Sequence, residues 1–132
     1  WDDFAAWVKT CGTRLILIEG NHDILGPLPF EKLGIQVCAT LQSGPFTYTH
    51  HPLQDFEGYN IAGHIHPAVR LTGEGRQSLR VPCFHFRNRQ LILPAFGAFT
   101  GSHLMKIRPG DRIYALAGDA IFPLEAASLK NS

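Results

Sequence analysis

The sequence predicts a layered α/β fold, and three observations lead to this prediction. Apolar residues recur at helical spacing at the start of the chain, and a continuous apolar run follows directly. Several short apolar runs, separated by glycine, proline and asparagine, then predict strands joined by turns. With 132 residues, 45% of them hydrophobic and 17% charged, the chain suits one core and is too apolar for a disordered segment.

The first two elements are predicted to be a helix and a buried strand. Gly12 is a plausible C-cap for the helix. Residues 14–18 form a continuous apolar run, which favours a strand buried on both faces, and helix followed by strand is the order found in layered α/β folds. The helix is indicated by apolar residues at i, i+3, i+4 and i+7, namely Trp1, Phe4, Ala5 and Val8.

The rest of the chain is predicted to be rich in strands. A loop covers 24–34 and contains one helical turn at 30–33, and a second loop covers 94–101. Asn88 and the pair Gly118-Asp119 are expected to form hairpin turns. Residues 1–123 are expected to belong to one domain, and 124–132 to form a flexible tail. The expected strands are 35–39, 45–49, 59–62, 69–71, 77–86, 90–93, 112–116 and 120–122.

Three of these strands end in polar side chains of the kinds that bind ligands. The ends are Glu19–Asp23, His50–Pro52 and Gly63–Pro67. Open α/β sheets bind ligands at the carboxyl ends of their strands, although each patch alone could be a polar turn.

In an extended or turning backbone, His64 and His66 would point to the same side and could face one pocket, with Gly63 leaving room around the first ring. Neutral imidazole is the commonest protein metal ligand, so this pair could bind one metal or two neighbouring metals. The alternative is a pair of surface histidines beside a turn.

Net charge, apolar runs and cysteine content indicate which partners and which compartment are expected. The net charge of +1 gives no overall field that would attract nucleic acid or a membrane. The sequence has no signal peptide and no apolar run of the roughly 20 residues that span a bilayer, so no membrane partner is expected. Cys11, Cys38 and Cys83 are odd in number and widely spaced, which favours free buried thiols in a reducing compartment, the cytoplasm, over a zinc site.

Taken in order, the three polar patches resemble the calcineurin-like metallophosphoesterases. The ordered blocks of that family are D-x-H, G-D-x-x-D, G-N-H-D/E, H and G-H-x-H. The last three occur here as Gly20-Asn21-His22-Asp23, His50 and Gly63-His64-Ile65-His66. His64–Pro67 and Leu91–Gly97 are more closely similar to the bacterial ligase-associated metallophosphoesterase, which is encoded beside a DNA ligase and a helicase. The resemblance implies an αββα sandwich, represented here mainly by its strand-rich C-terminal part.

The resemblance also implies the site residues. Two divalent metals would lie side by side, Mn²⁺ first among the candidates, with Fe or Zn²⁺ as alternatives. His50 is preferred over His51 as the ligand from the H-H-P patch, and His51 would then face the phosphate or support the ligands. Asn21, His50 and His64 would ligate one metal, and His66 would ligate the other. His22 would donate a proton to the leaving group or stabilise it. Asp23 would orient His22 or support its loop.

The chain departs from the family pattern at the first two blocks. No D-x-H occurs, and the two Gly-Asp pairs, Gly110-Asp111 and Gly118-Asp119, lie after the last block and are interpreted as turns. We therefore expect the chain to be the C-terminal portion of a longer domain, cut before Trp1. In the family, an aspartate of the G-D-x-x-D block bridges the two metals. Without this carboxylate, these 132 residues alone are expected to hold at most one weakly bound ion and to be inactive. The edge left by absent strands would favour homo-oligomers.

The function implied by the resemblance is metal-dependent hydrolysis of a phosphate ester. A phosphodiesterase or nuclease is expected, with nucleic acid as a substrate, DNA repair as its setting, and the DNA ligase or helicase as partners. The alternative is a non-catalytic scaffold of the same fold that acts through protein partners. His85 and His103 are expected to be ordinary structural histidines. An arginine cluster could bind a nucleic-acid backbone, although the solvated face of a hairpin is favoured; its members are Arg70, Arg76, Arg80, Arg87 and Arg89.

Overall fold

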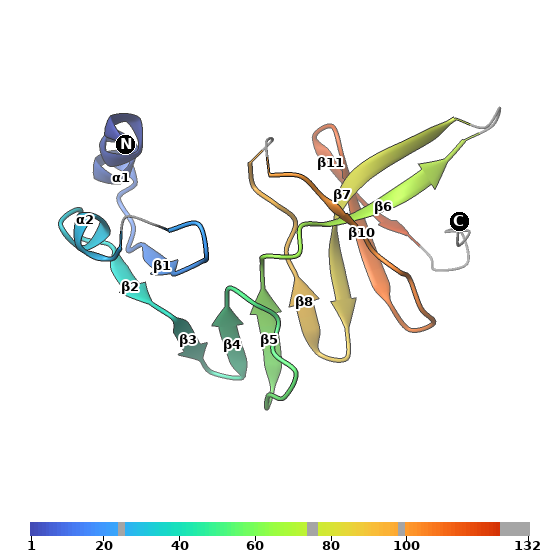
Figure 1. Cartoon of the computed structure of the whole chain (residues 1–132), viewed down its shortest axis with the longest axis horizontal. Coiled ribbons are helices and arrows are strands. Elements are labelled where there is room, and N and C mark those ends of the chain that lie inside the picture. The colour runs from blue at the N-terminus through green and yellow to red at the C-terminus, as the bar shows by residue number, and fades with distance from the viewer. Residues whose placement is uncertain (24–25, 74–76, 98–99, 125–132) are drawn as a thin grey trace.

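A computed structural model describes residues 1–23, 26–73, 77–97 and 100–124. These residues form a mixed α/β fold with few helices and a large sheet (Figure 1). Among them, no helix has the length and apolarity that a membrane span requires. The elements are α1 (Asp2–Thr10), β1 (Ile16–Ile18), α2 (Leu28–Glu31), β2 (Gln36–Cys38), β3 (Thr40–Ser43), β4 (Phe46–Thr49), β5 (Tyr59–Ala62), β6 (Pro67–Thr72), β7 (Ser78–Arg87), β8 (Gln90–Ile92), β9 (His103–Leu104), β10 (Arg112–Ala117) and β11 (Ala120–Leu124).

The N-terminal elements form a small unit of two helices and two strands. Strand β1 pairs with β2 in parallel. The rings of Trp1 and Phe4 lie edge-on to Phe30 at the end of α2, with centroids 5.3 and 6.1 Å apart, so the two helices contact each other through aromatic side chains. The predicted helix is confirmed, and Gly12 after it has a φ of 60°, which suits a glycine at a helix C-terminus.

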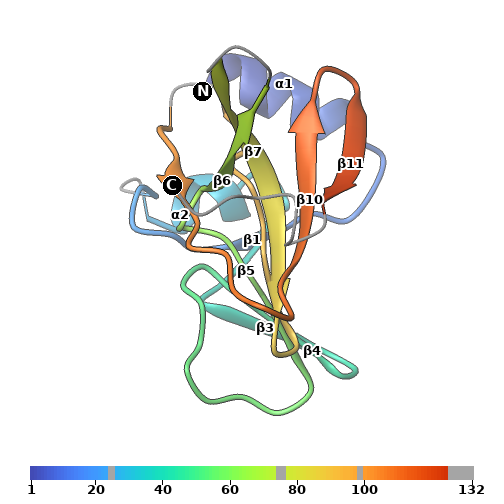
Figure 2. The ribbon, with the colours of Figure 1, turned by 90° about the vertical axis from the view of Figure 1, so that its right-hand side faces the viewer.

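The large sheet places the strand ends of β4 and β5 side by side. Its order is β11-β10-β7-β8-β5-β4-β3, with β6 paired to β7 and β9 paired to β6. Strands β4, β5 and β8 run parallel, and Thr49 at the end of β4 is the register partner of Ala62 at the end of β5. The chain therefore leaves both strands at the same edge, and the Gly63 amide donates to the His50 carbonyl at 3.1 Å. Figure 2 shows the same sheet from its side.

Asn60 fixes the connection that leads from β4 back to β5. Its side chain is fully buried, and its amide group donates to the Thr47 carbonyl and the Thr49 hydroxyl, each at 3.0 Å. Its Oδ1 accepts from the Leu53 amide and from the side chain of Gln90 on β8. One buried amide thus joins three parallel strands and the loop after His51, with all its polar atoms bonded.

The main core lies between β6, β7 and β10. It consists of Val69, Val81, Cys83, Ile113 and Ala115, all buried. Burial raises the pKa of the Cys83 thiol to about 12, so this thiol is inert at neutral pH. All three cysteines are free, as predicted, but only Cys83 is buried, whereas Cys11 and Cys38 are partly exposed.

A buried ion pair lies at the end of this core. His85 on β7 donates from Nε2 to Oδ2 of Asp111 at 3.0 Å, and the Arg87 guanidinium lies 3.5 Å from the other carboxylate oxygen. The Arg108 amide also donates to Oδ2 at 2.9 Å. His85 is the structural histidine that was predicted, whereas Asp111, interpreted as a turn residue, is buried and bonded across 26 positions of sequence.

Some elements differ from the prediction. Residues 14–18 were expected to be buried on both faces, but the strand covers only Ile16–Ile18, and Ile16 is 36% exposed because β1 has one strand partner among the described residues. No strand was expected between 39 and 45, but Thr40–Ser43 form β3, which reverses into β4 through Gly44, with a φ of 56°, and Pro45. The two-residue strand β9 was missed. The predicted tail lies outside the described residues from position 125 onward.

Candidate metal centre

Three ligand atoms converge where the small unit meets the edge of the large sheet. They belong to Asn21 in the turn after β1, His50 after β4 and His64 after β5. Nε2 of His50 lies 2.6 Å from Oδ1 of Asn21 and 3.1 Å from Nδ1 of His64, and the latter two atoms are 3.2 Å apart. Side chains separated by up to 43 positions in sequence therefore point at one another.

These separations suit a divalent metal. Ligands about 2.1 Å from a metal at near-right or tetrahedral angles lie roughly 3.0–3.4 Å from one another. The distances from His64 to His50 and to Asn21, 3.1 and 3.2 Å, fall in that range, and the 2.6 Å between His50 and Asn21 is shorter, as in a hydrogen bond. Two imidazole nitrogens and an amide oxygen form a donor set that suits Mn²⁺, Fe or Zn²⁺.

The environment keeps the two imidazoles neutral. Burial lowers the pKa of His50, and the neighbouring His51 and His64 lower it further. Burial also lowers the pKa of His64, with His51 and then His66 as the next contributors. Both rings thus remain unprotonated at neutral pH, the form that binds metals.

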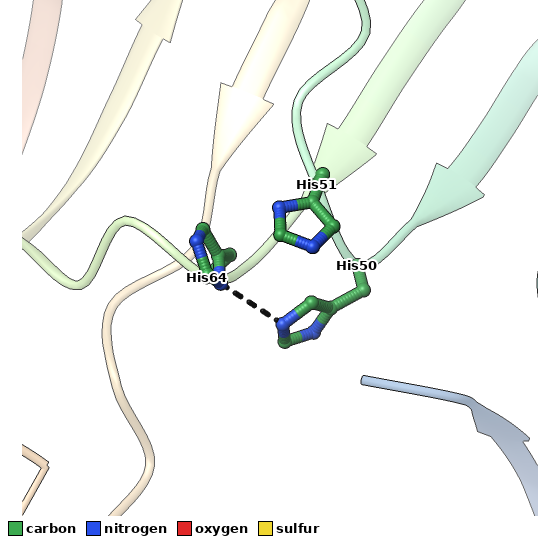
Figure 3. Close-up of side chains that lie close together, drawn as sticks. All are labelled: His50, His51 and His64. Carbon is green, nitrogen blue, oxygen red and sulfur yellow. Dashed lines mark hydrogen bonds between the residues drawn. The ribbon is translucent and has the colours of Figure 1, made fainter. Parts of the chain in front are cut away.

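His51 is the third imidazole of this cluster. Its ring centroid lies 4.0 Å from that of His64 and 4.8 Å from that of His50 (Figure 3). The ligand atoms of the three histidines lie within 4.8 Å of one another, and His51 is the most exposed. His51 therefore borders the same space, whereas Asn21 contacts His50 and His64 directly.

The two histidines of the H-x-H do not sit on an extended backbone. His64 has a φ of 63° and His66 a φ of 53°, and the Ile65 amide donates to the Gly63 carbonyl at 2.7 Å. Both histidines therefore adopt left-handed turn conformations at the end of β5 rather than continuing the strand. Positive φ in a residue other than glycine costs of order 1–3 kcal/mol and is often found at functional sites.

His66 is oriented by the segment that follows β8. Its Nδ1 lies 2.8 Å from the Thr100 carbonyl oxygen, and because a carbonyl can only accept, Nδ1 carries the proton. Nε2 is then left with its lone pair, as in many metal-ligating histidines held by a second hydrogen bond. The structure thus brings Asn21, His50 and His64 together and directs His66 to Thr100.

Asp23 closes the turn that carries Asn21 and His22. Its Oδ2 accepts from the Gly20 amide at 2.6 Å, and its own amide donates to the Gly20 carbonyl at 3.2 Å. This geometry fits loop support rather than orientation of His22. His22 is exposed and makes no hydrogen bond among the described side chains.

Gly20 is a site residue that the sequence analysis did not single out. A Cβ at this position would lie 2.7 Å from the His50 ring, closer than real Cβ contacts. A Cβ at Gly63 would meet the His50 carbonyl oxygen at 3.9 Å, an ordinary contact. Gly20 is therefore the glycine that makes room for the His50 ring.

Gly20→Ala is expected to weaken Mn²⁺ or Zn²⁺ binding at least tenfold by displacing the His50 ring, the scale seen when residues that support ligands are changed. Gly63→Ala is the matched control and should leave affinity within twofold, since its added methyl makes ordinary contacts. Isothermal titration of both variants checks this. Equal affinities would show that His50 is not confined by Gly20.

The comparisons with known proteins agree with this fold. No protein-family model matches the chain, and no curated protein matches it. The crystal structure of the Pseudomonas putida nuclease MPE is similar, with a TM-score of 0.77 and 32% sequence identity. The similarity covers 92% of this chain and 60% of the nuclease chain, so this chain spans about three fifths of the nuclease's length. The predicted α/β fold is confirmed.

Proposed function

We propose that this protein is a metal-dependent phosphoester hydrolase of the phosphodiesterase or nuclease type, in the metallophosphoesterase family that its sequence resembles. The observation that carries the proposal is the fold and sequence similarity to a nuclease. The convergence of Asn21, His50 and His64 gives the proposal a chemical basis.

The residues present would hold the metals unequally. Asn21, His50 and His64 would ligate one ion, and His66 would ligate a second with carboxylates from the D-x-H and G-D-x-x-D blocks, which the 132 residues do not contain. When bound, divalent metals polarise a phosphoryl group and lower the pKa of water. The thiols take no part, because the cluster consists of imidazoles and an amide.

The chain's own residues would position the substrate and move protons. His22, exposed beside the cluster, would donate a proton to the leaving oxygen. Asp23 would hold the turn through its bond to Gly20. His51, exposed at the border of the cluster, would face the phosphate.

A non-catalytic scaffold is the second candidate. It is favoured by the absence of both carboxylate blocks from these residues. The converging ligand set opposes it, because a scaffold has no need of strained histidines at φ of 63° and 53°. A role in DNA repair beside a DNA ligase or helicase, in the cytoplasm, also belongs to this proposal and rests on the sequence resemblance.

The test is hydrolysis of bis(p-nitrophenyl) phosphate by the full natural protein loaded with Mn²⁺. We expect turnover that EDTA abolishes and added Mn²⁺ restores. The 132-residue chain alone should show little turnover and bind at most one ion weakly. Absence of turnover in the full protein would favour the scaffold, and two tight metal equivalents on the 132 residues would contradict the ligand assignment.

A further inference from the structure

Arg70 and Arg80 lie directly opposite each other on the β6–β7 hairpin. They are register partners in the antiparallel pair, so their side chains project from the same face. Both are exposed. Like charges directly opposite each other destabilise a sheet, and no described carboxylate lies within salt-bridge distance of either guanidinium.

From the arginine pair to the hairpin end, this face is polar, whereas the next register pair toward the core on the same face is Ala68 and Pro82. Side chains alternate along a strand, so Thr72 shares the face with Arg70, and Ser78 shares it with Arg80. Thr72 and Ser78 are themselves register partners, and both are exposed. The opposite face supplies Val69 and Val81 to the core. Arginine and hydroxyl side chains are the groups that contact nucleic-acid phosphates.

The arginine pair is connected to the candidate metal centre through one short segment. Thr100 accepts from the ring of His66 at 2.8 Å, and Arg80 donates to the carbonyl and hydroxyl oxygens of Ser102 at 3.4 Å. Thr100 and Ser102 are at most ~7 Å apart along the chain. The Arg80 guanidinium therefore lies within roughly 14 Å of the His66 ring, and β6 itself begins at the residue after His66.

We propose that Arg70 and Arg80, with Thr72 and Ser78, form a binding track for the phosphate backbone of a polynucleotide whose scissile bond lies at the metal centre. This inference rests on the proposed function and names its substrate class as a nucleic-acid strand rather than a small phosphate ester. Phosphates of one strand of a duplex are spaced ~3.4 Å apart along the helix axis, so the track lies at most about four phosphates from the centre. Figure 1 shows the β6–β7 hairpin extending away from the end of β5, the strand that precedes His64 and His66.

The test measures binding of a fluorescein-labelled oligonucleotide, single-stranded and duplex, by anisotropy in EDTA. Relative to the unmodified full protein, the double variant Arg70→Gln/Arg80→Gln should bind at least tenfold more weakly. The slope of log affinity against log salt should fall by about 2, one for each lost phosphate contact. Hydrolysis of bis(p-nitrophenyl) phosphate should remain unchanged, because that substrate is too small to reach the track.

The matched control is Arg89→Gln/Arg112→Gln, which removes the same charge from two exposed arginines at the opposite end of β7. It should retain most of the affinity. Three results would contradict the proposed track. They are equal losses of affinity in both double variants, no loss in either, and binding to anionic lipid vesicles through the arginine pair without binding to DNA. Failure of the proposed hydrolase function is distinguishable, because it removes turnover of the small substrate and leaves the anisotropy comparison intact.

Discussion

His64→Ala is expected to abolish metal binding at the candidate centre and to reduce phosphodiester hydrolysis by roughly 10³-fold or more. Nδ1 of His64 lies close to both His50 and Asn21, so its removal leaves two ligand atoms where three converged. A metal supplies several kcal/mol of charge stabilisation to phosphoryl transfer, and each 1.36 kcal/mol corresponds to about tenfold in rate.

The measurement combines metal content with hydrolysis of bis(p-nitrophenyl) phosphate. His103→Ala is the matched control, because this exposed histidine on β9 lies outside the cluster. His64→Gly distinguishes loss of the metal ligand from loss of fold stability, because it also removes the ring. Glycine adopts the φ of 63° without strain, so the metal-free His64→Gly protein should be about 1 kcal/mol more stable than His64→Ala. Unchanged activity in both His64 variants would contradict the site.

Asp111→Ala is expected to destabilise the fold by about 3–5 kcal/mol. Its side chain is fully buried and accepts from His85 and from the Arg108 amide, with Arg87 beside it. Removal of one partner of a buried charged network leaves the others without compensation. Urea unfolding measures the loss. Asp119→Asn, in the exposed β10–β11 turn, should change stability by less than about 0.5 kcal/mol.

The same carboxylate makes stability depend on acid pH. Burial alone would raise the pKa of Asp111, but the hydrogen bonds from His85 and Arg108 and the charges of His85 and Arg87 outweigh it and lower the pKa. A carboxyl whose pKa is lower in the folded state stabilises the fold above its unfolded pKa of about 3.9, and this contribution is lost as pH falls through the folded value. Asp111→Asn should therefore differ most from the unmodified protein at neutral pH and least in strong acid.

The parts of the site predicted from sequence are those that local patterns encode. Apolar runs located β4 and β5, and the polar residues after them located His50 and His64. Parallel pairing of these strands then brings the two histidines to one edge of the sheet. The sequence pattern predicts this shared edge but not the distances between the rings. The convergence of Asn21 depends on how the small unit meets the sheet, which no local pattern describes.

The parts that were missed depend on tertiary context. Asp111 follows a glycine and reads as a turn residue, because its partner His85 is 26 positions away. The left-handed backbone of His64 and His66 was missed because histidine seldom adopts it without support from the surrounding structure. The role of Gly20 requires the position of a ring that lies 30 residues later in the chain.

The parallel pairing of β5 with β8 has a consequence for the order of folding. Residues 63–89, which include the β6–β7 hairpin, lie between these two strands in sequence. Hairpins form from local contacts within microseconds, whereas distant parallel pairing must first close a long loop. β8 can join β5 only after that loop has closed, and the segment after β8 supplies the Thr100 carbonyl that orients His66. The orientation of His66 is therefore completed late, after the pairing of β4 with β5 has brought His50 and His64 together.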